Sequence, residues 1–287
     1  MRMEKTVENT SSQTEKRSEP DLSDYKQMVL EKEKFQKILE NKVKELDRSN
    51  KELEEFAYIA SHDLQEPLRK ITSFSERLKE KLPPNLEPDV QLYLNRMLAA
   101  TDNMRMLIDN LLEFSRTSRS SEPFVQVNLN EVLTDARADL ELKIEESNAR
   151  IESDTLPTID AIPLQMRQLF TNLLSNAIKF KKADEPPFIS ITCKSLTVEE
   201  KEEYHLRENA TYYQLIVKDS GIGFNQEFEH KIFQIFQRLH GKAEYPGSGI
   251  GLAICKKIVD NHMGQLFARG DQGMGAAFFI ILPESQT

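Results

Sequence analysis

The sequence predicts a multidomain chain of the α and α+β classes: a coiled coil leads into an antiparallel helical hairpin, and a layered α/β domain follows. Apolar residues recur in alternating steps of four and three through the first part of the chain. A proline-rich break at residues 82–88 divides this pattern into two helices. From about residue 124, short β-branched and aromatic runs alternate with helical patterns, which is typical of a sheet with helices on one face.

Composition limits the class of protein and its partners. The 287 residues suffice for about two domains, and 39% hydrophobic with 30% charged residues indicates a soluble chain with a core. A net charge of -9 argues against nonspecific nucleic-acid binding, which needs a basic surface. Cys193 and Cys255 are too few for a disulfide framework, so we expect small core residues in a reducing cytosol. No apolar run could span a membrane and no signal peptide follows Met1, so we expect a cytoplasmic protein without a membrane span.

The first helix is predicted from about Gln27 to Lys81, after a polar segment, residues 1–25, that we expect to be disordered. A helix of about 80 Å is too long to stand alone, so its apolar seam predicts a partner helix. Asn50 occupies an a position of the heptad, where a polar residue fixes register and strand number, and we therefore expect a parallel homodimer. The seam comprises Leu39, Val43, Leu46, Asn50, Leu53, Ala57, Ala60 and Leu64.

Pro67 lies inside this helical pattern. It removes one backbone hydrogen bond and crowds the carbonyl of Asp63, so the helix either kinks or ends there. The pattern resumes at Ile71 and Phe74, which favours a kink.

The second helix predicts a hairpin, because it follows the first after a short loop. Two such hairpins in a dimer form a four-helix bundle. A Ser- and Arg-rich stretch, Ser115–Pro123, is predicted to be a linker. The seam of the second helix comprises Val90, Leu94, Met97, Thr101, Met104, Ile108 and Leu111.

The last part of the chain is predicted to contain a sheet. Its helical patterns cover about residues 129–148, 164–180 and 249–262. The charged stretch Ser195–Thr211 is predicted to be a long hairpin loop without chemistry of its own. The predicted strands are Phe124–Val127, Phe188–Thr192, Tyr213–Val217 and Ala276–Leu282.

His62 is the first candidate functional residue. With Ala57 at a and Ala60 at d, it falls at f and points to solvent beside Asp63. Such a histidine can act as a nucleophile or a proton carrier. From this helix alone, a solvated surface histidine is the simpler interpretation.

Three segments of the second part suggest a nucleotide site when taken together. Asn172 and Asn176 lie one helical turn apart with Lys179 nearby, and amide oxygens suit Mg²⁺ while an ammonium suits phosphate. Asp219 follows a strand and precedes two glycines, so its carboxylate can accept a hydrogen bond from an adenine amino group. The run Gly247–Leu252 opens a helix, where backbone N–H groups bind phosphate, but it fits neither the P-loop nor the dinucleotide motif. Each segment alone is also explained by polar surface or an ordinary turn.

The order of these motifs, with Phe233-x-x-Phe236 between the glycine segments, resembles a sensor histidine kinase of two-component signalling over about residues 45–283. The stretch Asp63–Pro67 is similar to the phytochrome-type branch. The resemblance implies a coiled-coil signalling helix (26–50), a dimerisation and histidine phosphotransfer domain (51–120) and a catalytic α/β-sandwich domain of the GHKL, or Bergerat, type (124–287).

The resemblance also implies roles for individual residues. Nε2 of His62 attacks the γ-phosphorus of ATP, and Asp63 acts as base or orienter on Nδ1. Asn176 coordinates Mg²⁺, and residues 225–245 form a mobile lid that includes the basic His240. Residues implied to contact ATP are Asn172, Asn176, Lys179, Phe180, Asp219, Gly221, Gly223, Arg238, Lys242, Gly247, Ser248, Gly249, Ile250, Gly251 and Leu252. The implied partners are a second copy of the chain, a response regulator receiver domain and an upstream sensor protein or domain.

Departures from the family pattern separate the competing functions. Asn172 stands where related ATPases carry a water-activating Glu, which favours transfer to His62 over hydrolysis. Glu66 stands where many members carry Thr or Asn, so we expect a kinase with weak phosphatase function. A nucleotide-binding scaffold or phosphorelay dimer, and less strongly a GHKL-type ATPase or protein serine kinase, are the alternatives. No sensor domain is recognisable before residue 50, so the input comes from a partner or from another part of a longer protein.

Overall fold

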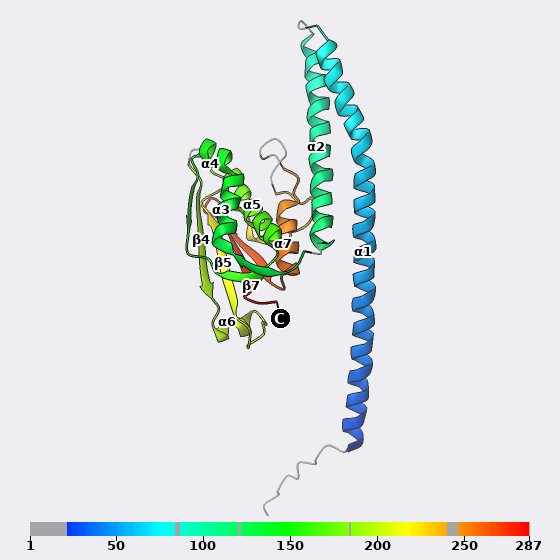
Figure 1. Cartoon of the computed structure of the whole chain (residues 1–287), viewed down its shortest axis with the longest axis vertical. Coiled ribbons are helices and arrows are strands. Elements are labelled where there is room, and N and C mark those ends of the chain that lie inside the picture. The colour runs from blue at the N-terminus through cyan, green and yellow to red at the C-terminus, as the bar shows by residue number, and fades with distance from the viewer. Residues whose placement is uncertain are drawn as a thin grey trace, which may run out of the picture. The chain divides into compact units, whose positions relative to one another are not determined.

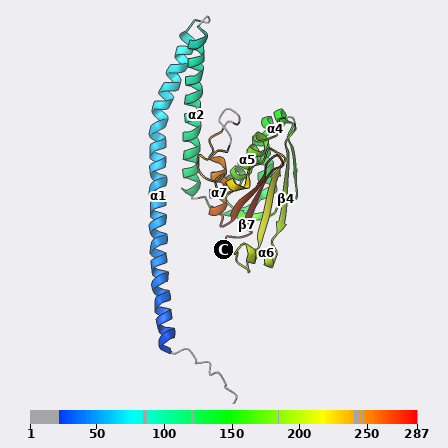
Figure 2. The same cartoon turned by 180° about the vertical axis from the view of Figure 1, so that it is seen from behind.

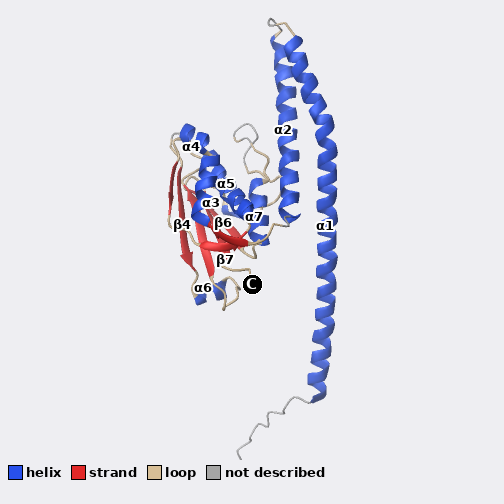
Figure 3. Cartoon of the chain, viewed as in Figure 1, coloured by secondary structure: helices blue, strands red, loops and turns tan. Residues whose placement is uncertain are grey.

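The computed structural model describes residues 22–83, 87–119, 122–183, 185–239, 245 and 247–286. The chain divides into two compact units, Met1–Leu53 and Glu54–Thr287, and each is described by itself. Figure 3 shows the change from helices alone in the first part of the chain to a mixture of helices and strands in the second. In the described residues, no helix is long and apolar enough to cross a membrane.

Helix α1, Leu22–Lys81, supplies all the described structure of the first unit. Because it begins at Leu22, the prediction of disorder is wrong for residues 22–25, and residues 1–21 lie outside the described part. No Gly or Pro occurs from Leu22 to Glu66, so nothing in this stretch interrupts helix propagation. The predicted seam residues Leu39, Val43 and Leu46 are each more than half exposed, as expected for a helix whose partner is another chain. The side chain of Asn50 lies outside the described part.

The second unit begins with a helical hairpin formed by the rest of α1 and by α2, Pro88–Arg119. Helix α1 continues through Pro67, so the alternative that it ends there is wrong, and Figure 1 shows its upper part inclining toward α2. Leu68 and Leu94 are buried in the hairpin. The predicted linker was placed too early, because residues 115–119 continue α2 and Ser115 is buried.

The rest of the second unit is an α/β sandwich, which confirms the predicted fold class. Its main sheet has the strand order β2-β4-β5-β7-β6; the β2–β4 pair is parallel and the other pairs are antiparallel. A separate antiparallel pair joins β1 to β3. The elements are β1 (Val125–Asn128), α3 (Leu129–Asp139), α4 (Glu141–Ser147), β2 (Arg150–Ser153), β3 (Thr158–Ala161), α5 (Pro163–Lys179), β4 (Phe188–Ser195), α6 (Val198–Glu203), β5 (Tyr212–Asp219), η1 (Gln226–Phe228), α7 (Gly251–Asn261), β6 (Gln265–Asp271) and β7 (Gly275–Pro283).

The core lies between the sheet and the helices α3, α5 and α7, which cover one of its faces in both views (Figures 1 and 2). Alternate residues of β4, β5 and β7 face this core, as the period of two in a strand requires. Cys255 is fully buried there, as expected, whereas Cys193 is partly buried and packs against the edge of the core.

Short elements account for the main differences from the sequence prediction. The helix predicted at residues 129–148 is divided into α3 and α4 at Leu140, whose backbone leaves the helical region while its side chain is buried. Strands β2, β3 and β6 were not predicted. The first two have four residues each, too few to show a strand period.

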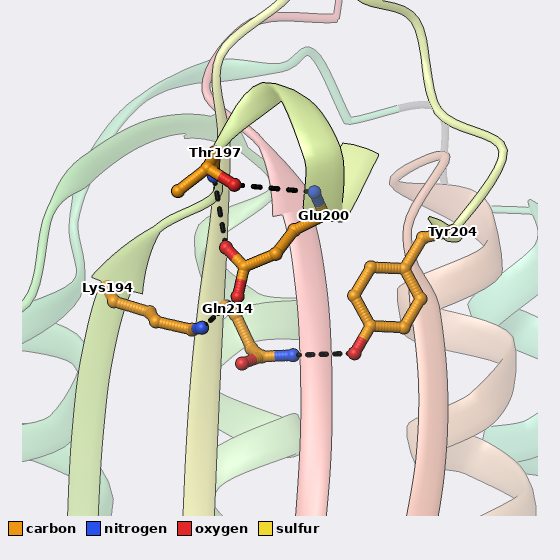
Figure 4. Close-up of polar contacts among 5 residues, drawn as sticks. All are labelled: Lys194, Thr197, Glu200, Tyr204 and Gln214. Carbon is orange, nitrogen blue, oxygen red and sulfur yellow. Dashed lines mark hydrogen bonds and ion pairs between the residues drawn. The ribbon is translucent and has the colours of Figure 1, made fainter. Parts of the chain in front are cut away.

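The connection between β4 and β5 joins two antiparallel strands, as the predicted long hairpin loop requires, but it contains the short helix α6, which was not predicted. The hydroxyl of Thr197 accepts a hydrogen bond from the backbone N–H of Glu200, and the Glu200 carboxylate accepts one from the Thr197 N–H (Figure 4). Lys194 pairs with Glu200, and Gln214 donates to the Tyr204 hydroxyl (Figure 4). These contacts cover a second small apolar cluster of Leu196, Tyr212 and Ile281.

A buried histidine joins the two helices that carry the predicted nucleotide motifs. His262 caps the C-terminal end of α7, and its Nδ1 lies 2.7 Å from the carbonyl oxygen of Ile258. Its Nε2 accepts a hydrogen bond of 3.0 Å from the backbone N–H of Ile162, which caps the N-terminus of α5. The two bonds require a neutral ring with its proton on Nδ1.

Candidate active site

A cavity of about 590 Å³ opens between α5, the end of β5 and the start of α7. Most of the residues that the sequence implied for ATP come together in its wall, although they are distant in the chain. These are Asn172, Asn176, Lys179, Phe180, Asp219, Gly223, Arg238, Gly247, Ser248, Gly249, Gly251 and Leu252.

Helix α5 presents its amides and its ammonium to this cavity. Asn172 and Asn176 line it one turn apart, and Asn172 Nδ2 lies 3.4 Å from the carbonyl oxygen of Gly251 at the start of α7. The ammonium of Lys179 lies 4.4 Å from the ring centroid of Phe180. Burial lowers the pKa of Lys179 below its usual value, and the nearby charge of Arg238 lowers that pKa further. An anion in the cavity would offset the repulsion between the charges of Lys179 and Arg238, so the wall is suited to phosphate.

Asp219 places a buried carboxylate at the end of β5. Its Oδ1 accepts hydrogen bonds from the backbone N–H groups of Gly221, at 2.9 Å, and Ala276, at 3.2 Å. Burial raises the pKa of this carboxyl above its usual range, and the two backbone donors partly offset that rise. Because both donors hold Oδ1, Oδ2 is available to accept a hydrogen bond from a base amino group.

Two glycines in the cavity wall have positive φ angles, which other residues rarely adopt. Gly223 has a φ of +64°, and a Cβ there would lie 2.0 Å from the carbonyl oxygen of Asp271. Gly247 has a φ of +151°, and a Cβ there would lie 2.7 Å from Nζ of Lys179. A side chain at Gly247 would therefore occupy the space beside the ammonium.

Some of the implied nucleotide residues have structural contacts instead of, or in addition to, a place in the cavity wall, and others lie outside the described part of the chain. Gly221 is not in the cavity wall, and its N–H orients Asp219. Ile250 is fully buried in the core, and its N–H donates to the Ser248 hydroxyl. Arg238 bonds the carbonyl oxygens of Tyr245 and Gly247, so it holds the loop before α7. Lys242 and His240 lie outside the described residues.

The sequence motifs did not reveal the apolar part of the wall. Ile178 of α5, Phe278 of β7, and Phe224 and Ile232 of the segment between β5 and α7 line the cavity. Tyr245 also lines it, and its ring lies 5.1 Å from that of Phe180. Only the folded chain brings these residues together, so no local pattern could have identified them.

His62 is exposed on α1, as its f position predicted, with 74% of its side chain accessible. Its Nδ1 lies 3.4 Å from Oδ1 of Asp63, so the predicted contact between these neighbours exists without ATP. A carboxylate beside Nδ1 favours the ring proton at that atom and leaves the Nε2 lone pair free. Glu66 pairs instead with Lys70, at 2.6 Å, and Gln65 bonds Asp109 of α2.

Comparison with known proteins agrees with this division of the site. Residues 52–119 match the His Kinase A (phospho-acceptor) domain. Residues 161–286 match the histidine kinase-, DNA gyrase B- and HSP90-like ATPase domain. The chain belongs to the sensor histidine kinases of two-component systems.

Relatives of this histidine kinase include phytochromes and sensor protein kinases. Cyanobacterial phytochrome A of a Nostoc species is 38% identical over 239 residues, which are 83% of this chain and 29% of that protein. Sensor protein kinase WalK of Staphylococcus haemolyticus is 30% identical over 253 residues, which are 84% of this chain and 38% of that protein. The histidine kinase chain thus matches well under half the length of these relatives.

Solved structures show the same fold. Full-length ShkA in complex with AMPPNP aligns with a TM-score of 0.58 at 22% identity, covering 80% of this chain and 45% of that one. ThkA in complex with the response regulator protein TrrA aligns with a TM-score of 0.53 at 22% identity, covering 81% of this chain and 62% of that one.

Proposed function

We propose that this chain transfers the γ-phosphoryl group of ATP to His62 and passes it to an aspartate of a response regulator receiver domain. One observation carries the proposal: the same chain holds an exposed histidine oriented by Asp63 and a cavity whose wall gathers the nucleotide motifs. The match to the ATPase family supports ATP as the nucleotide.

The residues of the cavity fit ATP and Mg²⁺. Oδ2 of Asp219 is free for the adenine amino group, and the space beside Gly247 leaves Lys179 free for phosphate. Among the described residues, no group of three or more His, Cys, Asp or Glu could hold a metal by itself. The amide oxygen of Asn176, with phosphate oxygens and water, suits Mg²⁺, which supplies charge neutralisation at the phosphates when bound.

The transfer step follows from the orientation of His62. Its Nε2 forms a bond to the γ-phosphorus as the bond from that phosphorus to the β,γ-bridging oxygen breaks. The bridging oxygen keeps the electron pair and leaves with ADP. The ring, now positively charged, loses its Nδ1 proton to Asp63, which lies 3.4 Å away.

We propose a homodimer as the working assembly, with residues 26–50 as the signalling helix, 51–120 as the phosphotransfer domain and 124–287 as the catalytic domain. The phospho-acceptor family match supports dimerisation, and the exposed α1 seam offers the surface for it. An upstream sensor acting through α1 supplies the input. Because Glu66 stands where many family members carry Thr or Asn, we expect weak phosphatase activity; its carboxylate pairs with Lys70.

Hydrolysis of ATP is the weaker alternative. Asn172 lines the cavity and occupies the sequence position at which related ATPases carry a water-activating Glu. An amide cannot act as a general base. Steady phosphate release without a labelled protein would favour this alternative.

Replacing the acceptor tests the proposal. We expect His62→Gln to abolish incorporation of acid-labile, alkali-stable phosphate from labelled ATP, because no ring nitrogen remains to form the bond. Nucleotide binding, measured by calorimetry, should be unchanged because position 62 is outside the cavity wall. We expect Asp63→Ala to abolish labelling while the variant still binds nucleotide. Undiminished label on His62→Gln would refute the assignment of the acceptor.

A further inference from the structure

The end of α2 lies against the two helices that carry the nucleotide motifs. Nε2 of Gln168, on α5, donates to Oε1 of Glu113 at 2.5 Å. The ammonium of Lys257, on α7, lies 4.0 Å from the ring centroid of Phe114. Phe114 also packs against the main core of the sandwich.

This packing brings α2 to the wall of the nucleotide cavity. Met106 and Asn110, one helical turn apart on α2, line that cavity together with Asn172 and Asn176. No sequence motif predicted this, because α2 precedes the sandwich by a linker and carries a core-type apolar seam.

A second cavity, of about 430 Å³, has the exposed acceptor histidine in its wall. Its wall contains Tyr58, His62, Gln65, Asp109, Asn110, Leu112 and Glu113. Asn110 alone among the described residues lines both cavities. It therefore stands between the nucleotide motifs and His62 within one chain.

The chemistry of Asn110 suits a path for a phosphoryl group. Its amide is neutral and half-buried, and it offers two N–H donors to phosphoryl oxygens. The two carboxylates that line the second cavity accept hydrogen bonds from amides: Asp109 from Gln65, and Glu113 from Gln168. An added carboxylate at position 110 would repel the phosphoryl oxygens, whereas the amide can hold them.

We propose that Asn110 is a catalytic residue that binds the γ-phosphoryl group of ATP as it passes to His62. This inference rests on the proposed kinase function. It assigns Nδ2 of Asn110 to an oxygen of the transferred group, while the bond changes remain those at Nε2 of His62 and at the bridging oxygen of ATP.

Binding measurements isolate the γ-phosphoryl contact without turnover. In the full chain, Asn110→Asp should lower the affinity for AMPPNP about tenfold and leave the affinity for ADP unchanged. Both affinities are measured by calorimetry with Mg²⁺. The matched control is Asn103→Asp, the same substitution on a half-buried site of α2 that lines neither cavity. It should change neither affinity. Equal loss for ADP and AMPPNP in Asn110→Asp, or no loss, would overturn the inference.

Reaction rates in both directions provide the second measurement. Asn110→Asp and Asn110→Ala should slow labelling of His62 by about tenfold or more, and should slow return of the phosphoryl group from His62 to ADP by the same factor. Spontaneous hydrolysis of the phosphohistidine in the absence of ADP should not change. If the wild-type chain takes no label, the proposed kinase function fails; if wild type and both variants label equally fast, only the role of Asn110 fails.

Discussion

At the scale of single residues, we expect the proposed adenine contact of Asp219 to make nucleotide binding depend on pH. A buried carboxylate with a raised pKa becomes protonated at a higher pH than an ordinary Asp, and the protonated form is a poorer acceptor for the adenine amino group. We therefore expect the affinity for ADP to fall as pH decreases through the pKa of Asp219. Calorimetry across a series of buffers measures this change.

The proposed contact between Asp219 and adenine is tested by removing the charge of the carboxylate and, separately, the amino group of the base. Asp219→Asn should lower the affinity for ADP by roughly tenfold to a hundredfold, because a hydrogen bond to a charged group contributes about 1.5–3 kcal/mol. The pH dependence should disappear in this variant. Purine riboside diphosphate, which lacks the amino group, should bind wild type more weakly than ADP does but bind the variant about as well as ADP does. A full preference for ADP in Asp219→Asn would refute the contact.

At the scale of elements, His262 couples the stability of the α5–α7 pair to pH. Burial lowers its pKa, although the bond to the Ile258 carbonyl opposes the shift. The unfolded chain therefore takes up a proton near pH 6.5, and the folded chain takes it up only at lower pH. The free energy of unfolding should fall as pH drops below about 6.5, by up to about 1.4 kcal/mol per pH unit, until the folded pKa is passed.

Hydrogen exchange of the α5 amides at several pH values, corrected for intrinsic rates, measures this effect. The control is His262→Gln, whose amide can donate and accept but does not titrate near neutral pH. The difference in protection between wild type and this variant should shrink as pH falls from about 8 to 5. A constant difference would show that the histidine does not titrate in this window.

The same elements show what sequence patterns can predict. The long helices and the central strands were predicted because a heptad seam or a strand of eight or nine residues repeats its period several times. The short strands β2 and β3, the division at Leu140 and the short helix α6 depend on packing and on one capping pair, Thr197 and Glu200, which local periodicity does not reveal. The predicted end of α2 was too early because the polar composition from Ser115 onward indicated a linker, whereas Ser115 is buried and continues the helix.

The candidate site was predictable to a similar extent. The polar residues came from motifs whose spacing is local, such as Asn172 and Asn176 on one helical face. The apolar wall and Asn110 came from tertiary packing, and the functions of Gly221 and Ile250 as supports of Asp219 and the core were visible only in the folded chain.

At the scale of the whole molecule, transfer can occur within one chain or between the two chains of a dimer. Asn110 lines both the nucleotide cavity and the His62 cavity of the same chain. The hydrogen bond between Gln168 of α5 and Glu113, and the contact of Lys257 of α7 with the Phe114 ring, support this arrangement within a single chain. We therefore expect each chain to phosphorylate its own histidine.

Mixed dimers distinguish the two routes. His62→Gln removes the acceptor, and Asn176→Ala removes the amide oxygen of the proposed Mg²⁺ site, so neither variant should label alone. Because transfer within a chain needs both sites intact in that chain, mixing the two variants should not restore labelling of His62. Exchange of chains must be verified by co-purification of differently tagged copies, with a wild-type mixture as the positive control. Label on the Asn176→Ala chain of a mixed dimer would show that the nucleotide of one chain reaches the histidine of the other.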